Sequence, residues 1–524
     1  MEKWSVIKYY RDILASEKGS ILKNARIKVA LVYPNSYEIG MQNLGFQTAY
    51  RVFNSFQNVC CERFVLDFYE DNLSIENQRF LAEFDIIALS INYEEDVLNF
   101  IKFLDSQKIP VFAEDRGAEY PPVIAGGALS LINPCLLYSI ADVQLAGDIE
   151  PMVSELKNIF EHYKDKKDFL NKLGALSYAI VDSKTERVEP ERKKGEDFAH
   201  SCIISGKGEF AGEYLVELSS GCKYNCRFCT ASYSFKPYRI FNRKKIIETV
   251  KNEYGVKNLG LISAAFGDLP DIYDLLAELR TMGYKVSVSS LRVDSLDDKL
   301  LSLLKNMGVR SVTIAEETAS EKLKRVIEKN ITPEQIYEKA EIIAKTGIEN
   351  LKLYYMIGLP FEKEDDILLI VDRIKRVADI FRETQIKYYN RIGRVRVSIN
   401  IFIPKPFTPF QHFEPDGKLS IKRKISLLKK GVARIPNVKF EIMSYNSAEL
   451  QMILSKAGFE VKELYKEYMR NGFHIKTAIN QYKKFKTSKA GDINKNFDWE
   501  ELIDHNTDEL LYREYEKCVK AKEE

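Results

Sequence analysis

Three cysteines within eight residues constrain this chain more than any other feature. Cys222, Cys226 and Cys229 follow an apolar run of β type, 214–218, and a Ser-Ser-Gly turn. Cysteine thiolates grouped in this way on a loop are the usual ligands of iron–sulfur clusters. A four-iron cluster held by only three cysteines would keep one iron open to another molecule. The motif therefore predicts a [4Fe–4S] cluster with a free coordination position.

Two other uses of the three cysteines fit the sequence less well. A structural zinc site needs a fourth Cys or His, and the sequence has no Cys-x2–4-Cys or His-x3–5-His pair elsewhere. A disulfide is disfavoured by the crowding of three cysteines. Lys223, Asn225 and Arg227 lie between them and do not fit burial of the thiols as small apolar groups. The cluster interpretation is therefore preferred.

The motif Cys222-x3-Cys226-x2-Cys229, with Phe228 before the last cysteine, resembles the signature of the radical S-adenosylmethionine (SAM) superfamily. This resemblance implies that the fourth iron binds the amino and carboxylate groups of SAM and that Phe228 lies against the adenine. It also implies that the reduced cluster cleaves SAM to methionine and a 5′-deoxyadenosyl radical. The cofactor carries this chemistry, and the protein supplies orientation and exclusion of water.

Composition is that of a globular protein with several domains. At 524 residues, 45% of them hydrophobic, the chain is long enough for about two to four domains. The net charge is +2, so any surface for polyanions has to be local. The sequence shows no apolar run of about 18 residues and no secretory signal pattern, and its other five cysteines are scattered. We therefore expect a reduced, cytoplasmic protein with no membrane partner.

Residues 1–165 are predicted to form a doubly wound parallel sheet of Rossmann type. Apolar strand patterns alternate with helical patterns, and ligands of such sheets bind at the carboxyl ends of the strands. This layout, placed before the cysteine motif, resembles the cobalamin (B12)-binding domain of a radical SAM subfamily, and 145–150 resembles one of its segments. The resemblance implies cobalamin contacts at the strand ends. The residues expected there are Asn35, Ser90, Gly126 and Gly127.

Other uses of this first domain stay open. The Asp-x-His-x-x-Gly loop that supplies an axial histidine in many cobalamin proteins is absent, and the only histidine before residue 200 is His162. Without cobalamin the sheet would be a scaffold, because a fold does not imply a function. A second cluster, as in methylthiotransferases, would need Cys60, Cys61 and Cys135. Adjacent residues on a strand point to opposite faces, so these three are interpreted as buried side chains.

Residues 213–415 are predicted to form a partial (β/α)6 barrel, joined to the first domain by a charged connecting segment, 166–212. Six runs of β type alternate with helical patterns, and the sites of such barrels lie at the carboxyl ends of the strands. The resemblance to the superfamily implies SAM contacts there. The expected contacts are Phe228, Ser263, Ala264, Ser290, Arg292, Glu317, Arg325 and Gly358.

Three further expectations concern the barrel mouth. Arg325 is expected to pair with the SAM carboxylate through a charge-assisted hydrogen bond. Gly358 is expected to let the backbone approach the adenine. The proline-rich segment 402–410 cannot be helical and resembles a loop of this group that lines the substrate.

Residues 416–524 are predicted to form a mainly helical cap. Basic residues gather near its start, among them Lys422, Arg423 and Lys424, and tyrosines are interleaved with further basic residues. This mixture is typical of surfaces that contact RNA. In a chain of net charge +2, lysines that only face solvent and are balanced by the many glutamates explain the pattern better, so RNA contact is the lesser alternative.

The sequence thus predicts a radical SAM enzyme that cleaves SAM reductively, with methyl transfer to an unactivated carbon if cobalamin binds. A reducing partner such as ferredoxin or flavodoxin is expected, and the substrate is unknown. Two alternatives stay open. One is an RNA-modifying radical SAM enzyme without cobalamin, and the other is an iron–sulfur electron carrier or binding protein.

Overall fold

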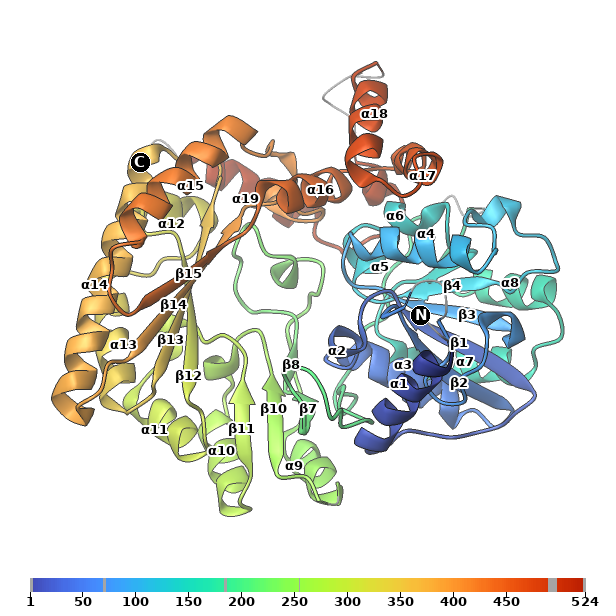
Figure 1. Ribbon diagram of the computed structural model, residues 1–524, viewed down its shortest axis with the longest axis horizontal. Coiled ribbons are helices and arrows are strands. Elements are labelled where there is room, and N and C mark those ends of the chain that lie inside the picture. Colours follow the sequence, from blue (N-terminus) through green and yellow to red (C-terminus); the bar gives the residue numbers. More distant parts are fainter. Residues whose placement is uncertain (1–2, 69–71, 183–185, 254, 489–496, 522–524) are drawn as a thin grey trace. The chain divides into compact units, whose positions relative to one another are not determined.

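The structure of this protein is a computed structural model that describes residues 3–68, 72–182, 186–253, 255–488 and 497–521. The chain divides into two units, which Figure 1 shows in sequence colours. Unit 1 comprises Met1–Tyr214 and Ile453–Asn506. Unit 2 comprises Leu215–Met452 and Thr507–Glu524. Both units therefore contain a part of the C-terminal region.

Unit 1 is built on a six-stranded sheet with the order β2-β1-β3-β4-β5-β6. The first five strands run parallel, and β6 is antiparallel to β5. β1 and β3 are buried almost throughout, as expected for parallel strands that are covered on both faces. The strands are β1 (Ile27–Tyr33), β2 (Val59–Val65), β3 (Ile86–Ser90), β4 (Val123–Gly126), β5 (Val143–Leu145) and β6 (Ala179–Ile180).

Helices cover both faces of this sheet (Figure 1). One face shares an apolar core with α1 (Lys3–Ser16), α3 (Leu44–Ser55), α7 (Ile149–Glu161) and α8 (Lys166–Gly174). On the other face, Phe64 of β2 packs against Phe103 of α4 (Asp96–Ser106). Three short helices complete this part: α2 (Tyr37–Gly40), α5 (Leu129–Ile132) and α6 (Cys135–Tyr138). The predicted doubly wound sheet is confirmed.

The adjacent cysteines of unit 1 lie on β2, a strand that the sequence analysis did not identify. Cys61 belongs to the apolar core beneath α3, whereas Cys60 is buried outside it. Cys135 is buried in α6. All three are buried small side chains, as predicted, and Cys60 and Cys61 differ in face because strand side chains alternate.

The first domain extends further than predicted. The segment 166–212 was expected to be a connection, but it begins with α8 and contains β6, which pairs with β5. Farther along, Glu191 bridges to Gly147 and Ile204 bridges to Lys18. The charged residues of this segment suggested an exposed connection. Its backbone nevertheless pairs with the sheet domain, and this pairing does not depend on the side chains.

The predicted helical cap is not one body. Its middle part packs on unit 1, where Tyr465 of α17 (Val461–Arg470) donates a hydrogen bond of 3.0 Å to the carbonyl of Leu136. Ile503 forms a parallel bridge with Val188. Its last helix, α19 (Asp508–Lys520), belongs to unit 2. The amphipathic face of α17 explains the difference, because its buried apolar side chains need a partner surface. The other helices of the region are α16 (Tyr445–Ser455) and α18 (Ile475–Ser488).

Unit 2 contains the partial barrel, in two sheets. The first has the order β11-β10-β7 and the second β12-β13-β14-β15, and a parallel bridge between Leu291 and Ile314 joins them. The strands are β7 (Glu213–Glu217), β10 (Asn258–Ile262), β11 (Lys285–Val288), β12 (Ser311–Glu317), β13 (Asn350–Ile357), β14 (Arg394–Ile401) and β15 (Val438–Ile442). The predicted partial barrel is confirmed, but β15 adds a seventh strand in a region expected to be helical. β15 is only five residues long and lies among helical patterns, so the sequence did not reveal it.

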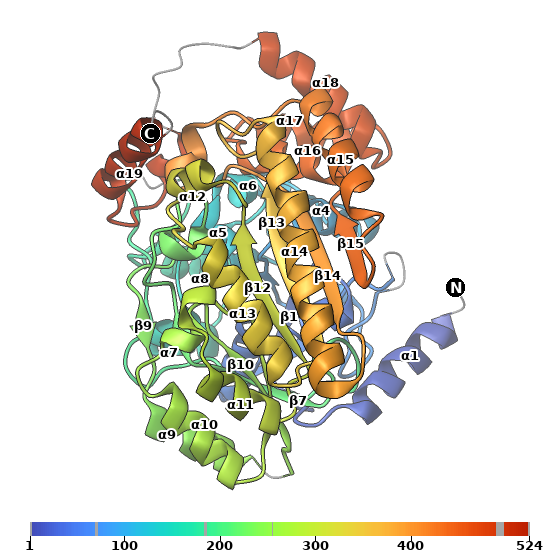
Figure 2. The ribbon, with the colours of Figure 1, turned by 90° about the vertical axis from the view of Figure 1, so that its left-hand side faces the viewer.

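Helices cover the outer face of the barrel strands, as α13 and α14 do in front of β12, β13 and β14 in Figure 2. Buried and less buried residues alternate along β13 and β14, as expected for strands with one face against helices. Thr332 caps α13 in a capping box with Gln335. The helices of this unit are α9 (Arg243–Asn252), α10 (Ile272–Thr281), α11 (Asp298–Asn306), α12 (Glu321–Ile327), α13 (Pro333–Lys345), α14 (Glu364–Tyr389), α15 (Lys418–Val432) and α19.

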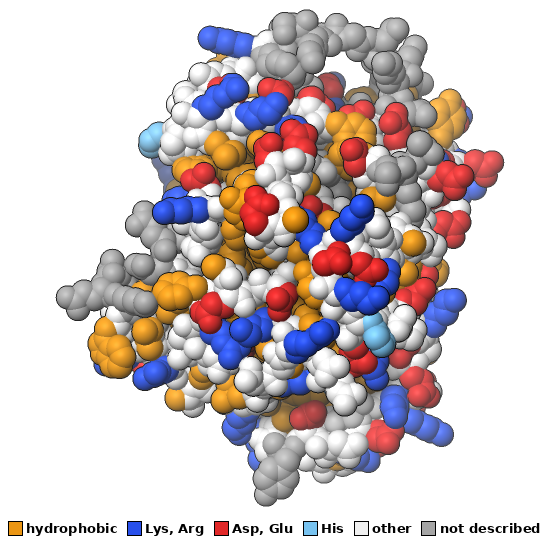
Figure 3. Space-filling model, turned by 90° about the vertical axis from the view of Figure 1, so that its right-hand side faces the viewer, with side chains coloured by type: hydrophobic (Ala, Val, Ile, Leu, Met, Phe, Trp, Pro, Cys, Tyr) orange, Lys and Arg blue, Asp and Glu red, His pale blue; other side chains and the backbone are white. Residues whose placement is uncertain are grey.

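The surface carries charges of both signs. On the face shown in Figure 3, Lys and Arg side chains are interspersed with Asp and Glu. This agrees with the small net charge of +2. Among the helices of the described ranges, none combines the length and the apolar character that crossing a bilayer requires.

Candidate active site

The three cysteines lie on the loop that follows β7 and the short strand β8 (Ser219–Ser220). β8 pairs with β9 (Arg239–Ile240), which closes the loop at its base. Gly221 has a φ of +70°, and a Cβ there would lie 2.4 Å from the carbonyl oxygen of Phe235. Only glycine fits this turn, because other residues rarely adopt that φ and the added atom would collide. The turn directs the cysteine loop away from the end of the strand.

Cys222, Cys226 and Cys229 are free thiols that lie near one another. Burial, with a smaller contribution from a charge on Cys229, raises the pKa of the Cys226 thiol to about 11. Burial also raises the pKa of Cys229, and a charge on Cys222 adds to that effect. In the described part of the chain, no three His, Cys, Asp or Glu side chains converge on the position of a single metal ion. In a cluster, each of the three thiolates would bind a different iron.

Arg227, between the second and third cysteines, fixes the loop to α12. Its backbone N–H donates to the carbonyl of Ile327 at 3.1 Å. Its guanidinium donates to the carbonyls of Arg325 at 2.7 Å and Val326 at 3.0 Å. These carbonyls are at the C-terminal end of α12, where the helix dipole favours a cation. Arg227 also pairs with Glu514 of α19 at 3.1 Å.

Arg292, after β11, lies beside the cluster loop from the other side. One guanidinium nitrogen is 4.0 Å from the sulfur of Cys226. The guanidinium also lies over the ring of Tyr224, 3.5 Å from its centre, and pairs with Asp294 at 2.9 Å. The Tyr224 hydroxyl in turn donates to Asp268 at 3.0 Å. The predicted residue Arg292 therefore contacts the cysteine loop itself, and a positive charge there would stabilise negative charge on a cluster.

The ends of three neighbouring strands are joined by serine hydrogen bonds. The hydroxyls of Ser219 and Ser263 are 2.7 Å apart, and the Ser289 hydroxyl donates to the carbonyl of Ser263 at 2.9 Å. Ala264 and Ser290 are exposed next to these positions. The predicted residues Ser263, Ala264 and Ser290 thus lie at one edge. The Ser263 side chain is used within the protein, whereas Ala264 and Ser290 face outward.

Glu317, at the end of β12, has an unusual backbone. Its φ is +68°, and the register of β12 shifts between Ala315 and Glu317. Positive φ in a residue with a side chain is uncommon and tends to occur at functional sites. Its carboxylate pairs with the buried Lys329 at 2.9 Å. Lys329 lies close enough to Cys226 to lower the pKa of that thiol, against the larger effect of burial.

Arg325 is the predicted partner of the SAM carboxylate. Its Nε atom is buried and has no hydrogen-bond partner among the described residues. A buried N–H without an acceptor is costly, so such an atom indicates a ligand that completes it. Arg325 lies on α12, the helix to which Arg227 fixes the cluster loop. Arg325 is therefore a hydrogen-bond donor of the kind expected for the SAM carboxylate, and its Nε–H can still bond to a ligand.

Phe228 and Gly358, the two residues expected near the adenine, both have contacts within the protein. Phe228 packs, partly buried, against an apolar cluster that includes Leu359 and Phe402. Gly358 has a φ of +83°, but its N–H donates to the buried carboxylate of Glu362 at 2.6 Å. The need for glycine is therefore explained by the turn. Phe228 is only partly buried, so a ligand could contact it, whereas the Gly358 N–H already has an acceptor.

Sequence reasoning missed Tyr224, Arg227, Asp268 and Lys329. Tyr224 and Arg227 lie inside the cysteine motif, where their spacing from the thiols could have indicated a supporting role. Lys329 and Asp268 carry no local signal, because their relation to the cysteine loop is tertiary. The basic run was also misjudged, since Lys424 is buried between Glu362 and Asp416, at 2.7 Å from each.

Unit 1 has its own candidate site at the carboxyl ends of β1 and β3. In a sheet of order 2-1-3-4-5, connections leave in opposite directions at this switch point, which is where ligands bind. Asn35, after β1, donates to Oδ1 of Asp96 at 2.7 Å. The other oxygen of Asp96 is buried without a partner among the described residues. Burial raises the pKa of Asp96 to about 6.

The other residues predicted for this edge lie close by. Ser90 is in register with Gly126 on the neighbouring strand. Gly127 has a φ of +110°, and a Cβ there would lie 2.4 Å from the carbonyl of Ile91, so the chain itself requires glycine. His162 is on the surface at the end of α7, bonded to the carbonyl of Asn158. The four predicted residues thus share one edge, and Asp96 joins them.

A partial barrel with three cysteines after its first strand defines a class of iron–sulfur barrel enzymes. Two family models match this chain: "Radical SAM superfamily" at residues 216–374, and "Radical SAM proteins, N-terminal" at residues 45–181. The chain belongs to the radical SAM superfamily, whose cofactors are a [4Fe–4S] cluster and SAM. The protein is therefore an enzyme.

Individual proteins extend this comparison. An uncharacterized protein of Methanocaldococcus jannaschii is 29% identical over 460 residues, 86% of this chain and 94% of that protein. An uncharacterized methyltransferase of Pyrococcus horikoshii is 25% identical over 276 residues, 51% of this chain and 56% of that protein. The structure of the radical SAM methyltransferase TsrM from Kitasatospora setae, with cobalamin and a [4Fe–4S] cluster bound, has a TM-score of 0.53 at 14% identity. It covers 74% of this chain and 77% of that one, and the similarity shows a shared fold.

Proposed function

We propose that this protein is a radical SAM methyltransferase that cleaves SAM at the three-cysteine loop of unit 2 and uses cobalamin held by unit 1. The proposal rests on two buried polar atoms that lack a hydrogen-bond partner among the described residues, Nε of Arg325 and Oδ2 of Asp96. Arg325 belongs to the predicted SAM site, and Asp96 lies at the predicted cobalamin site. The names of the Pyrococcus horikoshii relative and of TsrM support methyl transfer as the outcome.

In unit 2, Cys222, Cys226 and Cys229 would hold three irons of the cluster. The cluster would supply an electron to SAM. Arg325 would donate to the SAM carboxylate, because its Nε has no other acceptor in the described residues. Arg292 would donate toward the Cys226 sulfur, and the pairing of Arg227 with α12 would keep the loop in place. An external electron donor would have to reduce the cluster.

In unit 1, the edge formed by Asn35, Ser90, Gly126 and Gly127 would hold cobalamin. Cobalamin, when bound, would supply a methyl group that can be transferred to an unactivated carbon. The side chains fit its amide-rich periphery: the free oxygen of Asp96 accepts a hydrogen bond, and Gly126 has room, since the nearest atom to an added Cβ is 3.9 Å away. Of the histidines of unit 1, His162 lies on the surface at the end of α7, and the buried His505 has its Nε2 2.8 Å from the carbonyl oxygen of Leu131.

The first experiment mixes anaerobically reconstituted protein with hydroxocobalamin, removes the excess, and measures the visible spectrum together with bound iron. We expect about one cobalamin and four irons per chain, from the cofactor set of this class. Iron without cobalamin would contradict the role of unit 1, and a search for methylated products would then lose its basis.

A pair of cysteine variants tests unit 2 separately. We expect Cys226→Ala to lose most bound iron and the formation of 5′-deoxyadenosine from SAM. Cys60→Ala is the matched control, because Cys60 is a buried cysteine of β2 outside the loop. Equal iron in both variants would contradict the cluster assignment.

A further inference from the structure

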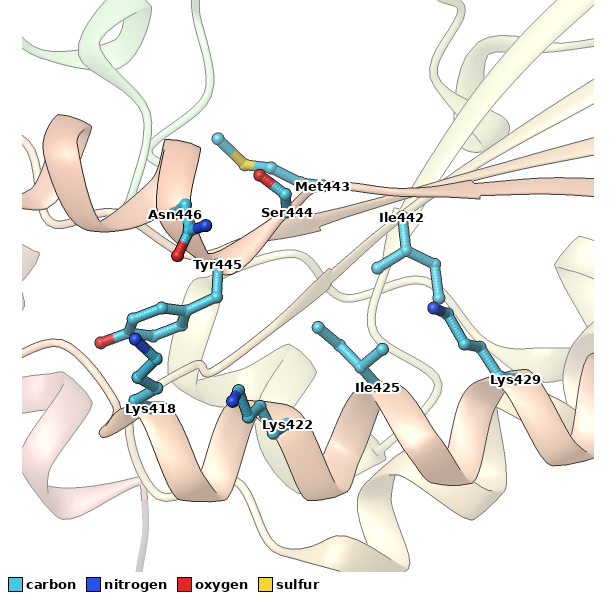
Figure 4. A pocket seen from close by; sticks show the side chains of 9 residues that line it. All are labelled: Lys418, Lys422, Ile425, Lys429, Ile442, Met443, Ser444, Tyr445 and Asn446. Atoms are coloured by element: carbon cyan, nitrogen blue, oxygen red, sulfur yellow. The ribbon is translucent and has the colours of Figure 1, made fainter. Parts of the chain in front are cut away.

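A groove on the outer side of the barrel edge is part of neither the proposed SAM site nor the proposed cobalamin site. It lies between α15 and the end of β15, with a volume of about 410 Å³. Figure 4 shows its lining side chains, which come from one face of α15 and from the end of β15 and the residues after it. The lining residues are Lys418, Lys422, Ile425, Lys429, Ile442, Met443, Ser444, Tyr445 and Asn446.

The charge of this groove is one-sided. Lys418, Lys422 and Lys429 line it, and no acidic residue does. None of the three lysines forms an ion pair with a described residue. Glu449 and Asp416 lie close enough to Tyr445 to raise its pKa, but neither lines the groove, and Asp416 is already paired with the buried Lys424 at 2.7 Å. Three cations without acids on one helix face repel one another, so an anion that binds between them would be favoured.

The length of the lysine row indicates a polymer and not a single anion. Lys429 is eleven positions after Lys418, which places them about 16 Å apart along a helix. One phosphate group cannot reach both ends, whereas successive phosphates of a strand can. A backbone that follows α15 would meet a lysine at the start, the middle and the end of the groove.

The floor of the groove suits bases and sugars. Ile425, Ile442 and Met443 make it apolar between the lysines. Tyr445 lies at one end beside Lys418 (Figure 4), and the Lys418 ammonium is 5.3 Å from the centre of its ring. Aromatic rings beside cations are the stacking platforms of single-strand binding proteins. Ser444 and Asn446 add a hydroxyl and an amide that can bond to ribose 2′-hydroxyls.

The groove leads toward the carboxyl ends of the barrel strands. Ile421, on the first half of α15, lies where it would be 2.8 Å from a Cβ on Gly358, at the end of β13. Lys424 of the same helix pairs with Glu362, which accepts from the Gly358 N–H. The Tyr445 end of the groove is therefore at the same end of the barrel as the SAM site.

We propose that this groove binds a single-stranded segment of RNA, and that RNA is the substrate class of the enzyme. The second part of this proposal rests on the proposed function. The lysines would neutralise successive phosphates, Tyr445 would stack on a base, and the strand would continue from the Tyr445 end toward the barrel mouth. Of the basic residues predicted for RNA contact, Lys422 is in the groove, whereas Lys424 is buried beneath it.

The test is the binding of a fluorescein-labelled single-stranded RNA to the full, cluster-loaded protein, followed by anisotropy without SAM over roughly 50 to 200 mM salt. We expect Lys422→Gln/Lys429→Gln to weaken binding and to reduce the slope of log K against log salt by about 1.4, or 0.7 for each phosphate contact. Tyr445→Leu should weaken binding about tenfold with little change in the slope.

The matched control is a second groove of unit 2, between α9 and α10, with a volume of about 340 Å³. It also has two lysines, Lys244 and Lys251, but Glu248 and Glu278 line it too. Lys244→Gln/Lys251→Gln should bind RNA as the wild type does. Iron per chain, measured on every variant, shows that each has folded.

Three outcomes would overturn the proposal: no RNA binding by the wild type, an equal loss in both double variants, or equally tight binding of single-stranded DNA of the same sequence. Because binding is measured without SAM, these results do not depend on cluster chemistry. A failure of the proposed methyl transfer would leave them unchanged, so the two failures can be told apart.

Discussion

Arg227 of the cysteine loop and Glu514 of the C-terminal helix α19 form a buried ion pair, with Nη2 and Oε2 3.1 Å apart. Both side chains are at most 5% exposed. The same arginine donates to carbonyls at the end of α12, so three elements meet at one guanidinium. The C-terminal helix therefore takes part in holding the loop that would carry the cluster.

Breaking this ion pair should release the loop. Arg227→Met removes the hydrogen bonds to α12 and leaves Glu514 with only the half-exposed Lys517, 2.7 Å away, as a cation, so it should cost roughly 3 kcal/mol, the lower end of the range for a broken buried ion pair. Glu514→Gln keeps hydrogen-bonding capacity and should cost about 1–3 kcal/mol. We expect both variants to unfold at lower temperature and to retain less iron after anaerobic reconstitution, with the larger loss in Arg227→Met.

The control for this prediction lies on the same helix. Glu516 is exposed on α19, so Glu516→Gln should change neither the unfolding temperature nor the iron content. Full iron in Arg227→Met would show that the loop keeps its shape without the ion pair.

Arg325 should matter for SAM binding and not for the cluster. Its buried Nε lacks an acceptor in the described structure, and a charge-assisted hydrogen bond is worth about 1.5–3 kcal/mol. We therefore expect Arg325→Gln to weaken SAM binding roughly tenfold to a hundredfold, with iron unchanged. Equilibrium dialysis with labelled SAM measures this. Lys322→Gln, on the same helix but paired with Asp366, is the control, and an equal effect there would contradict the assignment.

Arg292 and Asp294 should shift the reduction potential of the cluster in opposite directions. The guanidinium is 4.0 Å from the Cys226 sulfur and pairs with Asp294. Reduction adds negative charge, which a nearby cation stabilises. Arg292→Gln should therefore lower the midpoint potential by about 60 mV, a tenfold change for one electron, and Asp294→Asn should raise it. A redox titration followed by EPR tests both signs, and shifts of the same sign would contradict this account.

The local part of the site could be predicted from the sequence, and the tertiary part could not. The spacing of Cys222, Cys226 and Cys229 identified the loop because the ligands are close in the chain. The link from Arg227 to Glu514 spans 287 residues, and nothing near either residue indicates it.

The same limit applies to the fold. The strands β1 and β3 were predicted because they are continuous apolar runs. The strand β15 was missed although its apolar residues alternate with Lys439 and Glu441 as in a strand, because the run is only five residues long. Lys424 was expected on the surface because its neighbours in the chain are basic, whereas Glu362 and Asp416 draw it into the protein.

Asp96 gives a prediction about pH for unit 1. Its pKa is raised by burial from the ordinary value of 3.8 to about 6, so the folded protein disfavours the ionised form. The unfolded chain ionises this group first as pH rises. The cost to stability is therefore absent below pH 3.8, grows between pH 3.8 and about 6, and is constant above that.

Asp96→Asn should consequently stabilise the protein without cobalamin by up to about 3 kcal/mol above pH 6, since each pKa unit corresponds to about 1.36 kcal/mol. The gain should shrink as pH falls toward 4. The amide oxygen can still accept from Asn35, which keeps the local hydrogen bond. Unfolding temperatures at several pH values measure this, and Asp105→Asn, at an exposed position of the same helix, is the control.

Bound cobalamin should stabilise the wild type more than it stabilises Asp96→Asn. An amide that donates to the free oxygen of Asp96 favours the ionised carboxylate, so binding would lower the pKa of Asp96 and remove the cost of burying its charge. Hydroxocobalamin should then raise the unfolding temperature of the wild type more than that of Asp96→Asn, and the difference should be larger at pH 8 than at pH 5. An equal increase in both proteins at both pH values would mean that Asp96 does not face the ligand, and the site would have to be sought at another edge of unit 1.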